Sequence, residues 1–164
     1  MNYQIKKEKM TDDIIKQIMY IDKLFYKENY TLDWYKARYN ENNIAFCLYD
    51  NTKMVGYIVA AGIKKQLYDD FKDGKYENDY DITPNLFDYT SKYMYISSAN
   101  ILKEYRDNGF GTKLLDKLFD YYPNDMIAIT VSSAGYNLAK KKMTYIKNIT
   151  NEVAIFERKG NPNN

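Results

Sequence analysis

Histidine is absent from the 164-residue sequence, and cysteine occurs once, at Cys47. Without histidine the chain cannot form a histidine-based catalytic triad, a histidine-ligated zinc site or an imidazole general base. A single cysteine excludes an intrachain disulfide and a thiolate zinc cluster, as is usual in a reducing compartment. Any catalysis must therefore use carboxylates, tyrosines, lysines, backbone dipoles or water, and we expect that no metal is needed.

Arginine is also scarce, occurring only at Arg38, Arg106 and Arg158, and the formal net charge is +2. Because nucleic-acid-binding domains are normally strongly basic and use arginine for bidentate recognition, we expect no nucleic-acid partner. Residues 1–8 lack the apolar run of a signal peptide, and no segment approaches the roughly 18 apolar residues of a membrane span. We therefore expect a cytoplasmic protein with no membrane partner.

Proline occurs three times and glycine seven times, and neither forms a cluster that would divide the chain. The length lies within the usual range of roughly 100–200 residues for one domain. We therefore predict a single domain over residues 1–159, followed by a flexible tail at residues 160–164.

The spacing of apolar residues predicts alternating strands and helices. Thr11 stands where the N-cap of the first helix is expected, and Thr31 opens the second helical stretch. The polar turn at residues 50–53 predicts an antiparallel hairpin. The predicted strands lie near residues 3–5, 44–49, 54–60, 93–102, 126–131 and 153–156, and the predicted helices near residues 12–25, 31–38, 67–71, 109–122 and 134–143. Because strands alternate with helices in the second half, we expect a parallel crossover there. The fold class is therefore α/β, with a mixed, mostly antiparallel sheet flanked by helices.

An acidic insertion at residues 65–92 separates the third and fourth predicted strands. One interpretation is a solvated loop. The other is a negatively charged lid that attracts a cationic amine. Its acids are Asp69, Asp70, Asp73, Glu77, Asp79, Asp81 and Asp88.

The most informative segment joins a strand to a helix at residues 95–115, where Gly109 and Gly111 open the helix. The first turn of a helix has unpaired backbone N–H groups and the positive end of the dipole, which together suit a phosphate. Glycine lacks the Cβ atom that would keep a pyrophosphate at a distance. The segment therefore predicts an anion cradle formed mostly from backbone. Close helix-to-strand packing would also explain two glycines, and neither a P-loop nor a complete dinucleotide fingerprint is present.

The sequence Arg106-Asp107-Asn108-Gly109-Phe110-Gly111 resembles the Arg/Gln-x-x-Gly-x-Gly/Ala signature of the GNAT-superfamily N-acetyltransferases, which binds the acetyl-CoA pyrophosphate. Neighbouring segments agree in order. Residues 55–58 are similar to the third strand of the family, residues 127–131 to the strand after the signature helix, and residues 142–145 to a common Lys-Leu-Gly-Phe segment. The resemblance covers nearly the whole chain, although only the signature loop is specific. It implies a GNAT-like sheet that is splayed between the fourth and fifth strands.

The resemblance also implies that acetyl-CoA is the donor substrate, and it suggests which residues bind it. Backbone groups of Ala99, Asn100 and Ile101 correspond to those that bind the pantetheine arm. The main-chain amides that correspond to the pyrophosphate loop are those of Asp107, Asn108, Gly109, Phe110, Gly111 and Thr112. Arg106 either adds its charge to this cradle or orders the turn, and the two interpretations have equal weight.

The catalytic side chains depart from the family pattern. Members often have an asparagine early in the last helix and a tyrosine two turns later as general acid, and Ser133 and Lys140 occupy these positions here. Ser133 is therefore placed among the cofactor-binding residues, and Asn137 replaces the missing asparagine if the helix is shifted. Tyr136 lies one turn before Lys140 on the same face and is the candidate catalytic acid, although tyrosines are more often core residues. Tyr95 stands where some members have a catalytic glutamate, which leaves water or an acid of the insertion as the base.

The implied function is an acetyl-CoA-dependent N-acetyltransferase that modifies a primary amine of a small molecule or peptide by direct attack. The alternative is a catalytically weakened acyl-CoA-binding or regulatory module. Alignment of reactants contributes ~7–11 kcal/mol, against about 10²–10⁴-fold in rate from one general acid or base, so an unconventional acid is compatible with catalysis. The expected partner is an amine acceptor, cationic if the insertion is a lid, and the protein is expected to be a monomer or homodimer.

Overall fold

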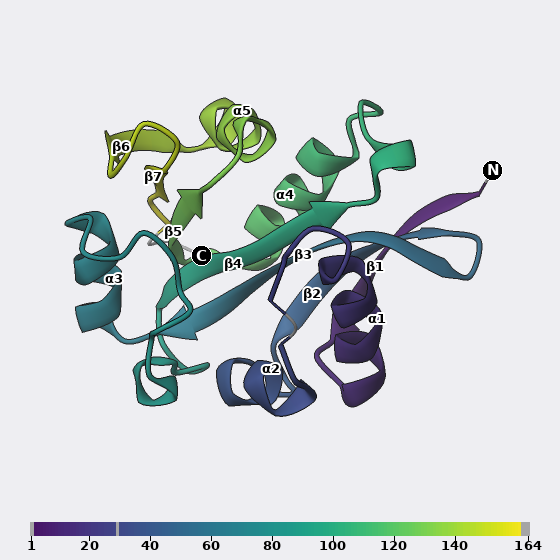
Figure 1. Ribbon diagram of the computed structural model, residues 1–164, viewed down its shortest axis with the longest axis horizontal. Coiled ribbons are helices and arrows are strands. Elements are labelled where there is room, and N and C mark those ends of the chain that lie inside the picture. The colour runs from purple at the N-terminus through teal and green to yellow at the C-terminus, as the bar shows by residue number, and fades with distance from the viewer. Residues whose placement is uncertain (1, 29, 162–164) are drawn as a thin grey trace. The chain divides into compact units, whose positions relative to one another are not determined.

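The computed structural model describes residues 2–28 and 30–161 and arranges them in seven strands and five α-helices (Figure 1). The strands are β1 (Tyr3–Lys9), β2 (Ile44–Asp50), β3 (Lys53–Ile63), β4 (Tyr93–Ile101), β5 (Asp125–Thr130), β6 (Thr144–Asn148) and β7 (Ala154–Arg158). The α-helices are α1 (Asp12–Asp22), α2 (Leu32–Arg38), α3 (Lys65–Lys72), α4 (Phe110–Tyr121) and α5 (Ser133–Lys142). Two 3₁₀ helices also occur: η1 (Pro84–Leu86) precedes β4 along the chain, and η2 (Lys103–Tyr105) follows it.

The strand order in the sheet is β1-β2-β3-β4-β5-β7-β6. β4 runs parallel to β5, whereas the pairs β1–β2, β2–β3, β5–β7 and β6–β7 are antiparallel. The predicted α/β class, with a mixed and mostly antiparallel sheet flanked by helices, is therefore confirmed, and so is the parallel crossover in the second half.

Residue contacts divide the chain into two units, and β3 and β4 contribute to both. Unit 1 comprises Met1–Ala60 and Ser98–Tyr121, and unit 2 comprises Ala61–Ser97 and Tyr122–Asn164. In the predicted tail, the Gly160 amide donates a hydrogen bond to Asp125 Oδ1 at 2.7 Å, while residues 162–164 lie outside the described residues.

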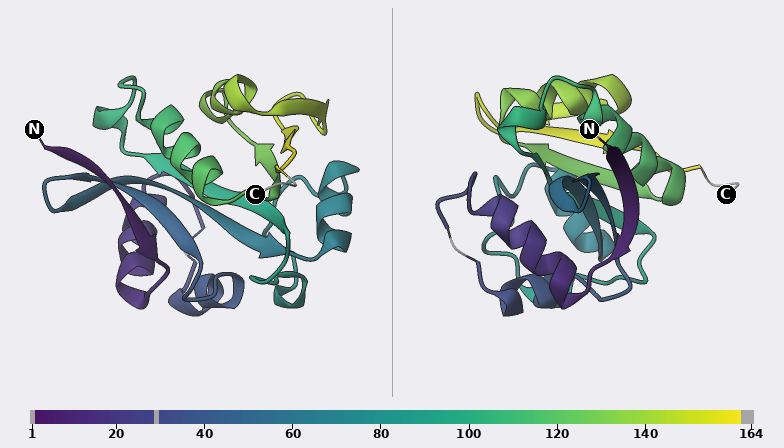
Figure 2. Two further views of the ribbon diagram at one scale, coloured as in Figure 1. Left: turned by 180° about the vertical axis from the view of Figure 1, so that it is seen from behind. Right: turned by 90° about the vertical axis from the view of Figure 1, so that its right-hand side faces the viewer.

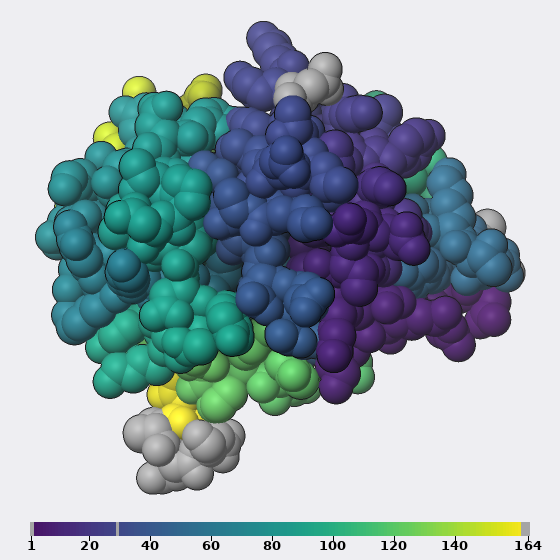
Figure 3. All heavy atoms as spheres, turned by 90° about the horizontal axis from the view of Figure 1, so that it is seen from below, coloured from purple at the N-terminus to yellow at the C-terminus, as the bar shows by residue number. Residues whose placement is uncertain are grey.

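Unit 1 is built on the β2–β3 hairpin, which confirms the turn predicted at residues 50–53. Thr11 and Thr31 are the N-caps of α1 and α2, and their hydroxyls accept from the amides of Ile14 and Trp34 at 3.4 and 3.2 Å. These side-chain caps satisfy amides that have no partner inside the helix. The two helices pack against each other, and their surfaces adjoin in the space-filling view (Figure 3).

The helices of unit 1 cover both sides of its strands (Figure 2). Phe46 of β2 packs edge to face with Tyr121 of α4, with ring centroids 5.9 Å apart. The next residue, Cys47, pairs with Tyr57 of β3, whose hydroxyl reaches Asp22 at the end of α1. Because consecutive strand residues point to opposite faces, α4 and α1 lie on opposite sides of the hairpin.

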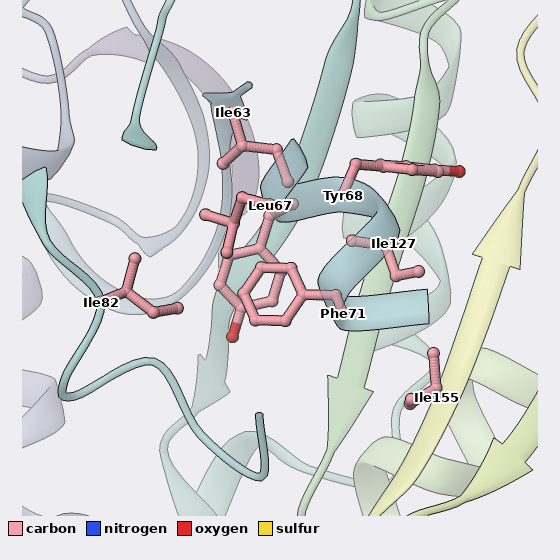
Figure 4. Close-up of a cluster of buried hydrophobic side chains, with 8 residues drawn as sticks. Ile63, Leu67, Tyr68, Phe71, Ile82, Ile127 and Ile155 are labelled. Atoms are coloured by element: carbon pink, nitrogen blue, oxygen red, sulfur yellow. The ribbon is translucent and has the colours of Figure 1, made fainter. Parts of the chain in front are cut away.

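Unit 2 has a core to which the acidic insertion contributes directly (Figure 4). Leu67, Tyr68 and Phe71 lie on one face of α3 and are at most 2% exposed, and Ile82 from the same insertion is also buried. They pack with residues of the sheet, namely Ile63, Tyr95, Ile127 and Ile155. The insertion is therefore part of the core of unit 2. It is neither a wholly solvated loop nor a separate lid.

One strand, β6, was not predicted. It pairs antiparallel with β7, with an irregular register between Tyr145 and Lys147. Four of its five residues are exposed and only Ile146 is partly buried. Because this strand buries so little, its sequence lacks the apolar alternation from which strands are predicted.

A buried carboxylate, Glu157 on β7, joins α3 to the sheet inside unit 2. Its Oε1 accepts from Tyr68 Oη at 2.7 Å and lies 3.0 Å from Lys159 Nζ, and its Oε2 lies 3.0 Å from Lys72 Nζ. Burial acts to raise the pKa of Glu157, but the hydrogen bonds from Tyr68, Lys159 and Lys72 outweigh it and hold the pKa below the ordinary 4.5.

The lowered pKa of Glu157 makes its contribution to stability depend on pH. A carboxyl group with a lowered pKa in the folded state stabilises the protein above its unfolded pKa, and this contribution is lost as the pH falls through the folded value. We expect Glu157→Gln to lower the free energy of unfolding at pH 7, and the difference from the wild type to shrink below about pH 4.5. Urea unfolding of both proteins at pH 7, 4.5 and 3.5 measures this, and a difference that is constant with pH would contradict it.

Candidate functional site

The end of β4 extends beyond its pairing with β5. The β4–β5 register stops at Ile96↔Ala128, although β4 continues to Ile101. On the other side, the Leu102 amide donates to the Val55 carbonyl at 2.8 Å, which joins this end to β3. Because alternate residues of an antiparallel strand direct their backbone groups to opposite neighbours, Ala99 and Ile101 direct theirs away from β3. The pairing of β4 with β5 thus ends near the position where the family resemblance implied a splay.

The loop after β4 contains two residues in the left-handed region, Asp107 with φ of 63° and Gly109 with φ of 74°. The Asn108 side-chain amide donates to the Arg106 carbonyl at 2.9 Å. Arg106 Nε donates to the Ile101 carbonyl at 2.9 Å, and its guanidinium lies 4.8 Å from the centre of the Phe25 ring. Of the two interpretations of Arg106, these contacts support the one in which its side chain orders the turn.

The loop leads directly into the N-terminus of α4. The Gly109 carbonyl accepts from the Lys113 amide at 3.2 Å, so the amides of Phe110, Gly111 and Thr112 belong to the first turn. Amides in this position have no partner within the helix, and the first turn contains no acidic residue. A Cβ atom placed on Gly109 would meet nothing within 4 Å. The loop therefore has open space at Gly109, and the turn that follows has amides that favour an anion.

Aromatic side chains fix the loop against the start of unit 1. The Tyr3 ring lies between Phe110, at a centroid distance of 4.9 Å, and Tyr105, at 6.1 Å. Tyr105 Oη also donates to Asp50 Oδ2 at 3.1 Å, next to the hairpin turn. Sequence reasoning did not identify these anchors, because residues so distant in sequence show no common spacing.

Two predicted site residues, Ser133 and Tyr136, lie in unit 2, whereas the residues predicted to bind acetyl-CoA between 99 and 112 lie together in unit 1. The N-cap of α5 is Ser132, whose Oγ accepts from the Gly135 amide at 3.1 Å, and Ser133 is the exposed first residue of the helix. Tyr136 is half-buried and packs edge to face on Phe156, with ring centroids 5.2 Å apart. Its catalytic role stays a prediction.

A polar cluster in unit 1 was missed by sequence reasoning. Asp22, the last residue of α1, is 6% exposed. Its Oδ2 accepts from Tyr35 Oη at 2.6 Å, and its Oδ1 accepts from Tyr57 Oη and from Asn100 Nδ2, the latter at 3.0 Å. Burial raises the pKa of Asp22, and the hydrogen bonds from Tyr35, Tyr57 and Asn100 oppose this rise only in part. Asn100, predicted to act through its backbone, thus also contributes its side chain.

The loop before α4 thus follows a part of β4 that lies beyond its last residue paired with β5. The family model of the acetyltransferase (GNAT) family matches residues 11–141. The chain therefore belongs to the GNAT acetyltransferase family, as the signature loop implied.

Solved structures with the same fold include enzymes of more than one activity. Naa50 of Arabidopsis thaliana, in complex with the bisubstrate analogue CoA-Ac-MVNAL, is 15% identical with a TM-score of 0.61, over 94% of this chain and 97% of that one. The ribosomal-protein-S18-alanine N-acetyltransferase of Escherichia coli is 11% identical with a TM-score of 0.60, over 94% and 92%. The GphF GNAT-like decarboxylase, in complex with isobutyryl-CoA, is 8% identical with a TM-score of 0.66, over 97% and 99%. No curated protein matched the sequence.

Two further structural findings concern the described part of the chain only. None of its helices has both the length and the apolar composition needed to cross a membrane. It also contains no group of three or more aspartate, glutamate or cysteine residues placed to hold a metal ion. The cytoplasmic location and the independence from metal stay predictions.

Proposed function

We propose that the protein is an acetyl-CoA-dependent N-acetyltransferase that acts on a primary amine of a small molecule or peptide. The observation that carries this proposal is the loop before α4, where Asp107 and Gly109 adopt left-handed conformations and a Cβ atom on Gly109 would meet only open space. The amides of Phe110, Gly111 and Thr112 would hold the pyrophosphate. Backbone groups of Ala99, beyond the end of the β4–β5 ladder, would bind the pantetheine arm.

The reaction is direct attack within one complex. The amine nitrogen attacks the thioester carbonyl, the carbon–nitrogen bond forms, the carbon–sulfur bond breaks, and the thiolate leaves and takes up a proton. Holding both reactants in line contributes ~7–11 kcal/mol, which is more than one general acid or base supplies. A cradle that orients the thioester is therefore the main requirement, and a missing family tyrosine is compatible with turnover.

Thiol release from acetyl-CoA tests this function. The purified protein is assayed with polyamines, aminoglycosides and peptides, and acetylation of the amine is confirmed by mass spectrometry. Acetyl transfer to one of these amines is the expected result. Calorimetric binding of CoA with no turnover on any amine would favour the alternative, a catalytically weakened acyl-CoA-binding or regulatory module.

A cationic acceptor is supported by the exposed acids of the insertion. Some of its acids already have local partners. Asp69 pairs with Lys65 at 2.5 Å and Asp70 with Lys75 at 3.4 Å, and Asp88 accepts from the Thr90 hydroxyl at 2.7 Å. Lys147 Nζ donates to the Asp73 carbonyl, which places a cation beside that residue. The exposed acids Glu77 and Asp81 remain as a source of negative potential that would attract an amine.

Tyr136→Phe is expected to lower the rate of acetyl transfer by at least about tenfold, because a phenol hydroxyl can donate a proton to the departing thiolate. The substitution retains the ring that packs on Phe156, so folding and acetyl-CoA affinity should change little. Steady-state kinetics with the best acceptor measures the effect, with Tyr145→Phe as a control because its ring packs on the same Phe156. An unchanged rate would remove Tyr136 from the mechanism.

A further inference from the structure

Asp22 occupies a position that is unfavourable for a carboxylate in three respects. It is buried, it stands at the negative C-terminal end of α1, and its partners in the described part of the chain are three neutral donors rather than a cation. Burial of an unpaired charge is costly, and a helix C-terminus favours a positive group. Carboxyl groups kept in such environments are often functional because they exchange protons.

A chain of hydroxyl groups leads from this carboxylate to the end of β4. Tyr57 Oη donates its only proton to Asp22 Oδ1, and it lies 2.5 Å from Ser98 Oγ. Since the tyrosine proton is already used, Ser98 must be the donor in this second bond. A serine hydroxyl that donates one hydrogen bond can still accept two. In both hydrogen bonds that link these hydroxyls to the carboxylate, the donor is therefore the group nearer Ser98 and the acceptor the group nearer Asp22.

The outer end of this chain adjoins the residues proposed to bind acetyl-CoA. Ser98 and Asn100 are half-buried, and they flank Ala99, whose backbone would contact the pantetheine arm. Asn100 Nδ2 also lies 3.2 Å from the hydroxyl of the half-buried Tyr26. The polar chain thus connects a buried carboxylate with the part of β4 that would lie next to the thioester.

We propose that Asp22 is the proton acceptor for the amine substrate, acting through Tyr57 and Ser98; this rests on the proposed function. In this step the substrate ammonium gives one proton to Ser98 Oγ, Ser98 passes its own proton to Tyr57, and Tyr57 passes its proton to Asp22. The products are a neutral amine, which carries the lone pair for attack, and a protonated Asp22. Ser98 is the catalytic residue that touches the substrate, and Tyr57 and Asp22 are positioning residues that act through it. The substrate class is an aliphatic amine that is protonated at neutral pH.

The groups that face Asp22 are hydroxyls and an amide, so Asp22 is the acidic group of the cluster. Tyr35 comes from α2, Tyr57 from β3, and Tyr26 from the segment after α1, and Tyr39 lies near Tyr35. Burial and the nearby Asp22 raise the pKa of both Tyr35 and Tyr57, so these hydroxyls stay protonated. Ser98 and Asn100 on β4 are neutral. Activity should therefore appear as the pH rises through the raised pKa of Asp22.

The test compares the pH dependence of kcat/KM in the wild type and in Asp22→Asn and Tyr57→Phe, using the best alkylamine from the acceptor panel. Both variants are expected to lose at least about 100-fold at pH 7, the range of one general base. Without a proton acceptor in the protein, the reaction depends on the fraction of the amine that is already neutral. The loss in kcat/KM should therefore shrink about tenfold for each pH unit toward the pKa of the amine. A merely structural role would leave the ratio of wild type to variant constant with pH.

Tyr35→Phe is the matched control, because it removes an equivalent hydrogen bond to the other oxygen of Asp22 and lies outside the chain to Ser98. It is expected to lower the melting temperature as Tyr57→Phe does, but to lose at least about tenfold less kcat/KM. Equal losses in the two tyrosine variants would overturn the proposal. So would an Asp22→Asn variant with wild-type activity and pH profile.

Calorimetric binding of acetyl-CoA separates failure of folding from failure of catalysis. If Asp22→Asn does not fold, Ser98→Ala replaces it, since it removes one half-buried hydroxyl and should retain acetyl-CoA affinity while losing at least about tenfold in rate. An unchanged rate in Ser98→Ala would overturn the proposal. If the wild type acetylates no amine, the proposed function fails and this inference fails with it; if the wild type is active and the variants match it, only the inference fails.

Discussion

Replacing Gly109 with valine is expected to weaken acetyl-CoA binding by about 100-fold or more while the protein remains folded. Gly109 has φ of 74°, a conformation in which a β-branched residue is strained by about 1–3 kcal/mol. Relief of that strain would move the loop, and the added methyl groups would occupy the open space beside the first-turn amides. Since about 1.4 kcal/mol corresponds to tenfold in affinity, strain and lost phosphate contacts together reach this magnitude.

Substitutions at Gly111, the second glycine, distinguish steric exclusion of acetyl-CoA from backbone strain. Gly111 lies in the first turn of α4, where a side chain is compatible with the backbone, so Gly111→Val should weaken binding by obstruction alone. Gly111→Ala adds the smallest side chain and a better helix former, and it serves as the control for helix stability. Isothermal calorimetry with acetyl-CoA and thermal melting measure the two effects. Wild-type affinity in both valine variants would refute the cradle.

Phe71→Ala is expected to lower the free energy of unfolding by about 3–5 kcal/mol, the usual cost of removing a buried phenylalanine side chain. Phe71 is fully buried at the centre of the unit 2 core (Figure 4), and its ring packs on Tyr95 at a centroid distance of 4.5 Å. The backbone of α3 and the strands around it would not close the resulting cavity. Urea unfolding followed by circular dichroism measures the loss.

Tyr89→Ala is the control for this substitution within the same insertion. Tyr89 is 56% exposed, so its replacement should change the free energy of unfolding by no more than about 0.5 kcal/mol. If Phe71→Ala and Tyr89→Ala had equal effects, the insertion would not be part of the core of unit 2.

Local sequence was sufficient for the parts of the fold whose physical cause lies within a few residues. Thr11 was recognised as an N-cap because it precedes two acidic residues and an apolar helical repeat, and Thr31 was placed at the start of the second helix. The β2–β3 hairpin followed from two apolar runs around a short polar turn. The parallel β4–β5 pair followed from the order of strand, helix and strand.

Where the sequence pattern was weak or ambiguous, only the structure could show how the segment folds. β6 could not be predicted, because an exposed strand has no apolar alternation. The insertion was judged by its acids, although four of its apolar residues, Leu67, Tyr68, Phe71 and Ile82, are core residues. Arg106 has two equal interpretations in the sequence, and its contact with the Ile101 carbonyl supports the one in which it orders the turn.

Sequence alone determined the family-specific loop, the fold class and the absence of histidine chemistry, since each depends on residue type or short-range spacing. The cluster around Asp22 depended on tertiary structure alone. Its donors Tyr35, Tyr57 and Asn100 lie 13, 35 and 78 residues away along the chain. No periodicity links positions so far apart. They meet because strand pairing and helix packing bring three polar side chains to the buried end of α1, where a carboxylate must be hydrogen-bonded.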